Sequence, residues 1–230
     1  MSSRGEADVA HLPAGAARLY EWLLRTGPAE KQTQEIAQDL VSRLDAGRVL
    51  DVGTGPGMLL LELHRLNSSF ELFGLDISAA MVQRARKNLE GFGVDVRQGS
   101  IRETDYSCDY FDAITCVGSF YLWDQPAECT NEIYRILKAG CSAYFWESYR
   151  DYDVRDFRRA LDANLATVDP VRRLISRMAL RKQLAMTYST EEFAQILDHT
   201  RFAGAPTLAK VTLARLPIWL RIELSKTAEV

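Results

Sequence analysis

The sequence has few cysteines, no long apolar run and no excess of positive charge. Its four cysteines form no Cys-x-x-Cys pair and its three histidines show no metal-ligand spacing, so we expect reduced thiols and no metal site. No apolar stretch approaches the ~20 residues that cross a bilayer, and residues 1–15 lack the apolar core of a signal peptide. A net charge of −3 disfavours nucleic-acid binding. We therefore expect a cytoplasmic protein without a membrane span or a nucleic-acid partner.

The chain of 230 residues is long enough to bury a sizeable core without disulfides or metals. Its hydrophobic content of 47% and charged content of 26% are ordinary for a globular protein, and no internal repeat interrupts it. We expect a single domain over residues 1–230. It would include helices at 13–45, before the first strand, and a helical lid inserted at 150–187.

Residues 48–63, RVLDVGTGPGMLLLEL, are the stretch around which the chain is organised. The apolar run 49–52 predicts a strand buried on both faces, and the good helix formers at 58–63 predict a helix. Gly53, Gly55 and Gly57 lie between them. Glycine permits a positive φ and the close approach of a ligand. Such a turn aims backbone N–H groups and a helix N-terminus at whatever lies above the strand.

Two acids distinguish this turn from one that holds a dinucleotide. The usual dinucleotide spacing is G-x-G-x-x-G around a pyrophosphate, which a nearby acid would repel. Here Asp51 precedes a G-x-G-x-G turn, and Asp76 ends the next apolar run, where it can accept hydrogen bonds from ribose hydroxyls. Both acids suit a nucleoside with a cationic amino-acid tail, and S-adenosylmethionine is such a molecule.

The segments VLDVGTGPG at 49–57 and LFGLDISAAMVQRARKN at 72–88 resemble a known family. It is the class I S-adenosylmethionine-dependent methyltransferases, especially the small-molecule branch similar to quinone-biosynthesis methyltransferases. The resemblance extends over residues 20–148. It implies S-adenosyl-L-methionine as cofactor and methyl transfer to an O, N, C or S atom of a small-molecule acceptor. We expect a monomer or a homodimer.

Pattern and resemblance together predict an α/β fold. It is a Rossmann-like, seven-stranded, mostly parallel sheet with helices on both faces, an antiparallel terminal strand and a helical lid. The expected strands are 49–52, 71–75, 94–101, 111–117, 142–146, 207–215 and 217–224. Helices are expected between them and in the lid at 154–168 and 171–185.

The resemblance also implies which residues contact the cofactor besides Asp51 and Asp76. They are Tyr20, Gly53, Thr54, Gly55, Gly57, Ile77, Met81, Gly99, Ser100, Ile101, Val117 and Ser119. Tyr20 would close over the cofactor, and Ile77 and Met81 would pack on the adenine. Ser100 departs from the family, which usually has an acid there to bind the adenine amino group. Its hydroxyl, the backbone or Asp105 would have to make that contact.

The segment after the fourth strand should line the place where methyl group and acceptor meet, because the carboxyl ends of parallel strands open on the ligand crevice. Tyr121 and Trp123 are its candidate acceptor-facing aromatics, and Glu147 follows the fifth strand. Tyr121 and Glu147 are the candidate catalytic residues, with Tyr149 and His11 as alternative bases. A base is needed only where the acceptor arrives protonated and weakly acidic.

The lid insertion carries nine basic residues against five acids. The excess predicts either the capture of an anionic acceptor or a solvated helical face.

Three other functions remain open from the sequence. A nicotinamide-dependent oxidoreductase would share the glycine turn, although the spacing and Asp51 disfavour it. A non-catalytic binding subunit could keep the same fold. Methylation of thiols or arsenite through cysteines would depend on Cys129 and Cys141, which lie outside the predicted strand cores.

Overall fold

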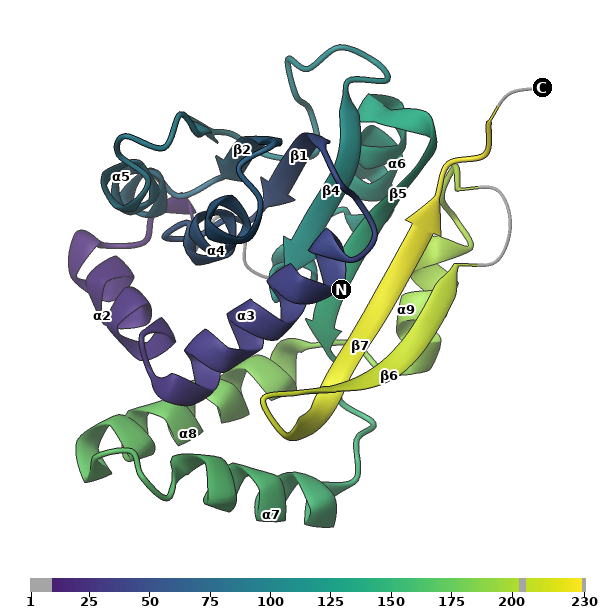
Figure 1. Ribbon diagram of the computed structural model, residues 1–230. Helices are drawn as coiled ribbons and strands as arrows, with labels where there is room; N and C mark the ends of the chain where they lie inside the picture. The colour runs from purple at the N-terminus through teal and green to yellow at the C-terminus, as the bar shows by residue number, and fades with distance from the viewer. Residues whose placement is uncertain (1–9, 203–205, 229–230) are drawn as a thin grey trace.

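The computed structural model describes residues 10–202 and 206–228, in which seven strands form one sheet of order β3-β2-β1-β4-β5-β7-β6 (Figure 1). The strands are β1 (Gly47–Val52), β2 (Phe70–Asp76), β3 (Asp95–Gln98), β4 (Phe111–Val117), β5 (Leu137–Ser148), β6 (Thr207–Leu213) and β7 (Leu216–Ser225). Strands β1 to β5 pair in parallel, whereas β7 runs antiparallel to both β5 and β6. The predicted fold class is confirmed, including the antiparallel terminal strand.

Helices cover both faces of the sheet. They are α2 (Ala14–Leu24), α3 (Gly27–Val41), α4 (Met58–Leu66), α5 (Ala79–Asn88), α6 (Pro126–Ile136), α7 (Val154–Leu165), α8 (Pro170–Met186) and α9 (Thr190–Leu197), with a short 3-10 helix η1 (Phe120–Leu122) after β4. Val49 packs in a core cluster with α3, α4 and α5, while its neighbour Leu50 packs in another with α6 and α9. Side chains alternate along a strand, so β1 is buried on both sides.

Local sequence signals set the starts of the helices after β5. Asp153 accepts hydrogen bonds from two backbone N–H groups at the start of α7, and Asp169 caps α8, with Pro170 in its first turn. Ser189 and Glu192 form a reciprocal capping box at the start of α9. Aspartate and serine satisfy backbone donors that a helix leaves free at its N-terminus. Helices α7 and α8 begin within one residue of their predicted positions.

The strands β3 and β5 differ most from their predicted bounds. β5 begins at Leu137 rather than at residue 142, with an irregular register against β4 between Phe111 and Ala113. β3 is confined to Asp95–Gln98, since it lies at the edge of the sheet and pairs with β2 alone. Both differences depend on strand pairing, which a local pattern does not contain.

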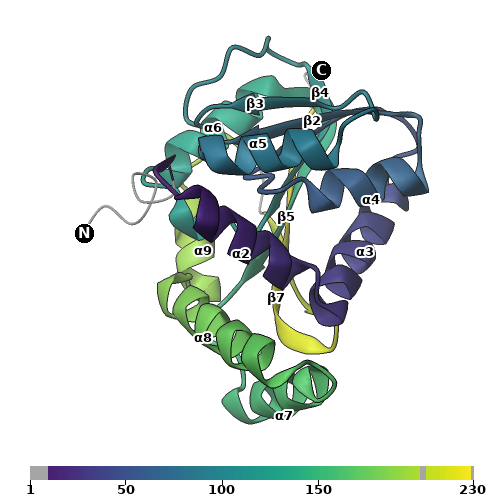
Figure 2. The same cartoon turned by 90° about the vertical axis from the view of Figure 1, so that its left-hand side faces the viewer.

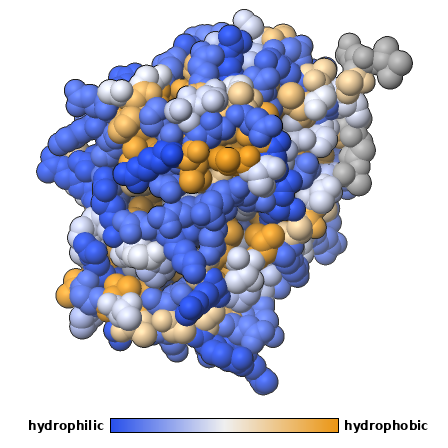
Figure 3. Space-filling view, viewed as in Figure 1, coloured by the Kyte–Doolittle hydropathy of each residue, from blue (hydrophilic) through white to orange (hydrophobic). Residues whose placement is uncertain are grey.

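The carboxyl ends of β4 and β5 point toward the side of the sheet where α2 and α8 lie (Figures 1 and 2). The face of the molecule seen in Figure 3 is mostly hydrophilic, with hydrophobic residues in small patches. In the part of the chain that is described, no helix is both long and apolar enough to cross a membrane. The fold thus leaves the strand ends, α2 and α8 to form a site.

Candidate functional site

A cavity of about 770 Å³ opens at the carboxyl ends of the central strands. The ends of β1, β2 and β4, the loops after β3 and β4, and helices α2 and α8 form its wall. In a parallel α/β sheet this is the edge where ligands bind. The volume falls within the range of roughly 300–1,000 Å³ that is common for small-molecule sites.

Two glycines of the turn are favoured for different reasons: Gly53 by a close approach of its neighbour, and Gly55 by a positive φ of +54°. Gly53 has a φ of +71°, and a Cβ built on it would lie 2.3 Å from the Ser119 Oγ atom. A Cβ on Gly55 would lie 3.9 Å from the Tyr20 ring, which α2 places beside the turn. The turn therefore exposes bare backbone to the cavity between Ser119 on one side and Tyr20 on the other.

Asp76 lies at the end of β2 on the cavity wall, with 7% of its surface exposed. Its Oδ2 accepts a hydrogen bond of 2.8 Å from the Gly55 N–H, and its Oδ1 accepts one of 2.8 Å from the Ser78 N–H. Burial raises the pKa of this carboxyl, and the two backbone donors oppose that rise. Each oxygen keeps further lone-pair capacity, so the fixed carboxylate can accept hydrogen bonds from a diol.

Asp51 lies beneath the turn rather than on the cavity wall. Its Oδ1 accepts a hydrogen bond of 2.9 Å from the Thr115 hydroxyl, and 3% of the residue is exposed. Burial, together with the negative charge of Asp76, raises the pKa of Asp51 to about 7. A cation bound near the turn would favour the charged form of both acids.

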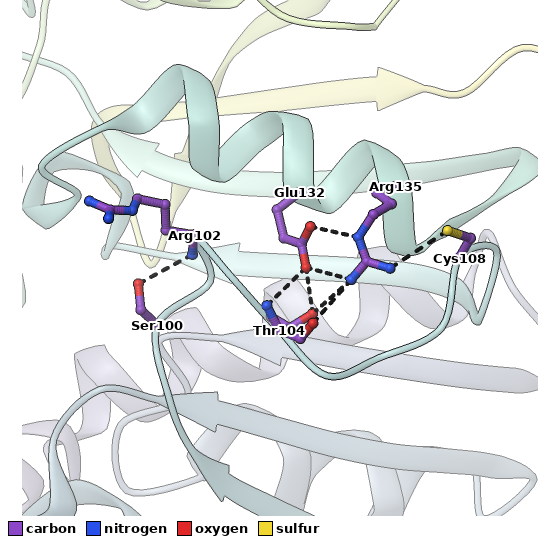
Figure 4. A network of polar contacts seen from close by, with 6 residues as sticks. All are labelled: Ser100, Arg102, Thr104, Cys108, Glu132 and Arg135. Carbon is purple, nitrogen blue, oxygen red and sulfur yellow. Dashed lines mark hydrogen bonds and ion pairs between the residues drawn. The ribbon is translucent and has the colours of Figure 1, made fainter.

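Apolar side chains and one hydroxyl form the wall beyond Asp76. Ile77, Met81 and Ile101 line the cavity there, beside Gly99 and Ser100. This flat, apolar lining suits the faces of an adenine ring. The Ser100 hydroxyl accepts a hydrogen bond of 3.2 Å from the Arg102 N–H, so it holds the loop after β3 (Figure 4). Asp105 is exposed and is absent from the described wall, so it does not replace the family's acid there.

The same loop is tied to α6 by an ion-pair network (Figure 4). Glu132 Oε1 accepts hydrogen bonds from the Thr104 N–H, at 3.0 Å, and from the Thr104 hydroxyl, at 2.6 Å. Arg135 donates to both oxygens of Glu132, at 2.7 and 2.6 Å. The network fixes the loop from the side away from the cavity, and with it the position of Ser100 and Ile101.

Two tyrosines face the cavity from opposite elements, Tyr20 from α2 and Tyr121 from η1. Burial, and to a lesser extent the charges of Asp76 and Glu147, raise the pKa of Tyr20 to about 12, although 46% of the residue is exposed. Burial also raises the pKa of Tyr121, with smaller effects of Tyr20 and Glu147. Both phenols are therefore protonated at neutral pH and can donate or accept a hydrogen bond, but neither is a strong base.

Glu147 is fully buried behind the wall, where its Oε1 accepts hydrogen bonds of 3.0 Å from both the Ser119 and the Phe120 N–H groups. Its Oε2 is buried and has no hydrogen-bond partner among the described residues. Burial raises the pKa of Glu147 to about 7, against the lowering effect of these donors. The carboxyl thus holds the loop after β4 in place and carries a proton below neutral pH.

We expect Glu147 to make the fold less stable as pH rises. Its pKa is about 7 in the folded protein and near 4.5 when exposed, so unfolding releases a proton between those values. The contribution of Glu147 to the free energy of unfolding falls between pH 4.5 and pH 7 and is lost above pH 7. The free energy of unfolding should therefore fall as pH rises. Near pH 6, Glu147→Gln should make that fall smaller by about 1 kcal/mol per pH unit. Urea unfolding between pH 5 and 8 measures the slope.

Glu103→Gln, at an exposed position, is the matched control and should leave the slope unchanged. Asp51 is still present in the Glu147→Gln variant and keeps a residual slope, because its pKa is also raised to about 7. Equal slopes for the wild type and Glu147→Gln would contradict the buried, protonated carboxyl.

The structure brings most of the sequence-predicted site residues to one wall. These are Tyr20, Gly53, Gly55, Asp76, Ile77, Met81, Gly99, Ser100, Ile101, Val117, Ser119 and Tyr121. Four are placed elsewhere. Asp51 and Glu147 are buried behind the wall, Thr54 is buried in the turn, and Gly57 packs on Leu89 at the start of α4.

The sequence analysis predicted the lid helix α8 but did not name the residues by which it lines the cavity. Its Ile175, Met178, Ala179, Lys182, Gln183 and Met186 line the cavity, opposite Leu12, Ala16, Leu19 and Leu23 at and before α2. The helical spacing of the α8 residues was a visible signal, but it does not tell which face turns to the sheet. Of the nine basic lid residues, Lys182 alone lies on the described wall.

The arginines lie on the other side of the lid. Arg150, Arg158, Arg177 and Arg181 line a second cavity of about 680 Å³ between α7 and α8. Arg177 pairs with Asp162 at 2.6 Å and Arg150 with Glu192 at 2.5 Å. These arginines therefore do not face an acceptor in the main cavity.

The alternative bases Tyr149 and His11, and the four cysteines, are also absent from the described wall of the main cavity. Tyr149 donates a hydrogen bond to the Pro217 carbonyl, at 3.4 Å, and neither it nor His11 lines the cavity. In the described part of the chain the four cysteines form no disulfide and do not line the cavity. Cys141 lies within β5, so its predicted position outside the strands is wrong. The site thus offers no cysteine for methylation through a thiol intermediate.

S-adenosylmethionine fits the residues that are present. Bare backbone at Gly55 gives room for the nucleoside, and Asp76 supplies an anchored carboxylate for its ribose. Ile77, Met81 and Ile101 supply an apolar wall for its base. Asp51 and Asp76, the two buried acids beside the glycine turn, give the region a negative charge that complements the cationic amino-acid end of the cofactor.

Comparisons with known sequences agree with this geometry. The family described as "Methyltransferase domain" matches residues 49–140. The uncharacterised methyltransferase YdaC of Bacillus subtilis is 30% identical over 128 residues, which are 54% of this chain and 70% of that protein. The ubiquinone/menaquinone biosynthesis C-methyltransferase UbiE of Desulfotalea psychrophila is 30% identical over 95 residues, 41% of this chain and 39% of that protein. The chain thus spans less than half of UbiE.

Solved structures show the same fold. A putative S-adenosylmethionine-dependent methyltransferase from Methanococcus maripaludis superposes with a TM-score of 0.70 at 24% identity, covering 94% of each chain. The plantazolicin methyltransferase BpumL, solved with S-adenosylhomocysteine, gives a TM-score of 0.70 at 15% identity, covering 98% of this chain and 95% of that one. These structures show the shared fold, while the match to the methyltransferase family favours the methyltransferase prediction over the oxidoreductase alternative.

Proposed function

Because this chain belongs to the S-adenosylmethionine-dependent methyltransferase family, we propose that its cavity transfers a methyl group to a small, largely apolar acceptor. The observation that carries the proposal is the placement of Asp76. Its carboxylate is fixed by two backbone N–H groups at the end of β2, beside a turn with glycine at positions 53, 55 and 57. Such an arrangement suits a ribose diol, with the rest of the nucleoside along Ile77 and Met81.

The acceptor half of the cavity is apolar. Leu19 and Leu23 of α2, Ile175 and Met178 of α8, and Trp123 line it together. Among the described wall residues, Lys182 is the cation and Asp76 the acid, and Asp76 is engaged at the cofactor end. We therefore propose an acceptor with an apolar body and one anionic group near Lys182.

The bound cofactor supplies a methyl group that is already activated and leaves a neutral sulfide. What the protein adds is alignment of the acceptor atom and exclusion of water. Tyr121 and Gln183 are the polar groups on the wall that can orient the acceptor by hydrogen bonding. We assign Glu147 a positioning role, since its carboxyl holds the Ser119 and Phe120 backbone and does not lie on the wall.

Turnover tests the proposal directly. The protein would be incubated with S-adenosylmethionine and a panel of alkylated phenols, thiols and amines, each with and without a carboxylate. We expect release of S-adenosylhomocysteine that depends on the acceptor and favours apolar members. Cofactor binding without turnover on any member would instead support the non-catalytic alternative.

Lys182→Met should raise the KM for a carboxylated acceptor about fivefold, because a partly exposed ion pair contributes about 1 kcal/mol. The KM for the matched acceptor without the carboxylate should change by less than twofold, since methionine keeps the apolar stem. Steady-state kinetics on the pair gives both values. An equal change for both acceptors would show that Lys182 does not recognise the anion.

A further inference from the structure

Helix α8 has an outer face that combines exposed apolar side chains with positive charge. Val171, Leu174 and Met178 are 64%, 61% and 65% exposed. Their spacing of three and four residues places them in one row along the helix. Arg181 and Lys182 follow Met178 by three and four positions and so continue the same row, with the exposed Arg181 at the border toward the cavity between α7 and α8. We call these five residues the α8 face.

The charge of α8 is of one sign. Within Pro170–Met186 there are five basic residues and no acid. Three of the five are engaged: Arg172 lies over the Trp22 ring, Arg173 donates to backbone carbonyls, and Arg177 pairs with Asp162. Arg181 and Lys182 form no ion pair within residues 10–202 and 206–228, so two cations on the α8 face are available to an anionic partner.

The α8 face is continuous with the mouth of the main cavity. Met178 and Lys182 belong both to the face and to the cavity wall. Leu19, which is 45% exposed, lies on the opposite rim and comes from α2. Figure 2 shows α8 at the surface next to α2. A surface that covers the α8 face would therefore also cover the entrance to the apolar cavity.

We propose that the α8 face docks on the surface of an anionic lipid bilayer. Apolar side chains flanked by lysine and arginine are the composition of helices that lie in a membrane interface. Each basic residue near an anionic surface adds attraction, and each apolar side chain adds burial. A second copy of this chain is a poorer occupant, because two α8 faces would bring like charges together. Docking itself does not depend on methyl transfer, whereas the entry of an acceptor from the bilayer rests on the proposed function.

Docking would place the cavity mouth against the lipid. An apolar acceptor dissolved in the bilayer could then enter between Leu19 and Met178 without crossing water. Arg181 would lie at the level of the lipid headgroups, and Lys182 at the cavity mouth, where it would meet an anionic group of the acceptor. This is a peripheral contact, made by one helix face.

Vesicle co-sedimentation tests the docking. Wild-type protein would be mixed with vesicles of phosphatidylcholine alone, and with vesicles containing about one third phosphatidylglycerol, at low and high salt. We expect binding to the anionic vesicles that weakens as salt rises. Leu174→Gln should weaken this binding about fivefold or more. Leu174 is absent from the described cavity wall, so affinity for S-adenosylhomocysteine should stay within twofold.

The matched control is Leu66→Gln, which makes the same change at a 42% exposed leucine at the end of α4. It should leave vesicle binding unchanged, and thermal melting should show both variants folded. The proposal is overturned if the wild type fails to bind anionic vesicles, or if both variants lose binding equally. It is also overturned if Leu174→Gln abolishes self-association in solution while vesicle binding stays the same.

Discussion

Asp76→Ala should weaken the binding of S-adenosylhomocysteine at least tenfold. The substitution removes the acceptors for two ribose hydroxyls, and losing hydrogen bonds to a charged group costs about 1–3 kcal/mol. It also leaves the Gly55 and Ser78 N–H groups without their partner, so the turn itself should loosen. Calorimetric titration of the purified variant measures the dissociation constant.

Asp95→Ala is the control for this change. Asp95 lies in the neighbouring edge strand, pairs with Arg97 and is absent from the described cavity wall. The affinity of the Asp95→Ala protein for S-adenosylhomocysteine should stay within twofold of that of the wild type. An unchanged dissociation constant for a folded Asp76→Ala protein would show that this carboxylate does not hold the ribose.

Gly53→Ala should destabilise the fold and abolish tight cofactor binding. The new Cβ would lie 2.3 Å from Ser119 Oγ and 2.6 Å from Ser119 Cβ. Ser119 cannot easily move away, because its N–H donates to the buried Glu147 and its hydroxyl donates to the Val52 carbonyl. Overpacking and the positive φ together should cost about 2–4 kcal/mol. Urea unfolding measures the loss of stability.

Two further variants separate collision from backbone strain. Gly91→Ala has a φ of +86° and nothing within 4 Å of its Cβ, so it should lose about 1 kcal/mol from strain alone. Ser119→Gly added to Gly53→Ala removes both colliding atoms and should restore part of the stability. Equal losses at positions 53 and 91 would mean that the contact with Ser119 is not what requires glycine.

The glycine turn and Asp76 were predictable because their signals are local. A short apolar run, three glycines and a helix-forming segment specify strand, turn and helix without reference to the rest of the chain. Asp76 ends the next apolar run, so its place at the strand end follows from the same pattern. The structure places both on the cavity wall.

The placement of the Asp51 and Glu147 side chains could not be predicted from local sequence patterns. Asp51 lies opposite Thr115 in the β1–β4 register, and their hydrogen bond directs the carboxylate under the turn. The Glu147 carboxylate accepts hydrogen bonds from two backbone N–H groups of the loop after β4. Both placements depend on which strands are neighbours. A sequence supplies the residues for such a contact but not the register that makes it.

The lid shows a similar limit. Two helices and their caps were predictable from Asp153, Asp169 and Pro170, whereas the direction of the basic residues was not. The helix α8 turns Ile175 and Gln183 into the main cavity, and Arg177 and Arg181 toward α7. The rotation of α8 about its axis is set by packing on the rest of the protein. Of the basic lid residues, Lys182 is the one on the described cavity wall, so the prediction of an anionic acceptor depends on Lys182.

Calorimetric titration of the wild-type protein with S-adenosylhomocysteine tests most directly whether this cavity holds the methyl donor. We expect one site per chain with a micromolar dissociation constant, weakened by Asp76→Ala and unaffected by Asp95→Ala. NADH should give no heat and should not compete. The absence of any binding at millimolar S-adenosylhomocysteine by a folded protein would contradict the assignment of the cavity.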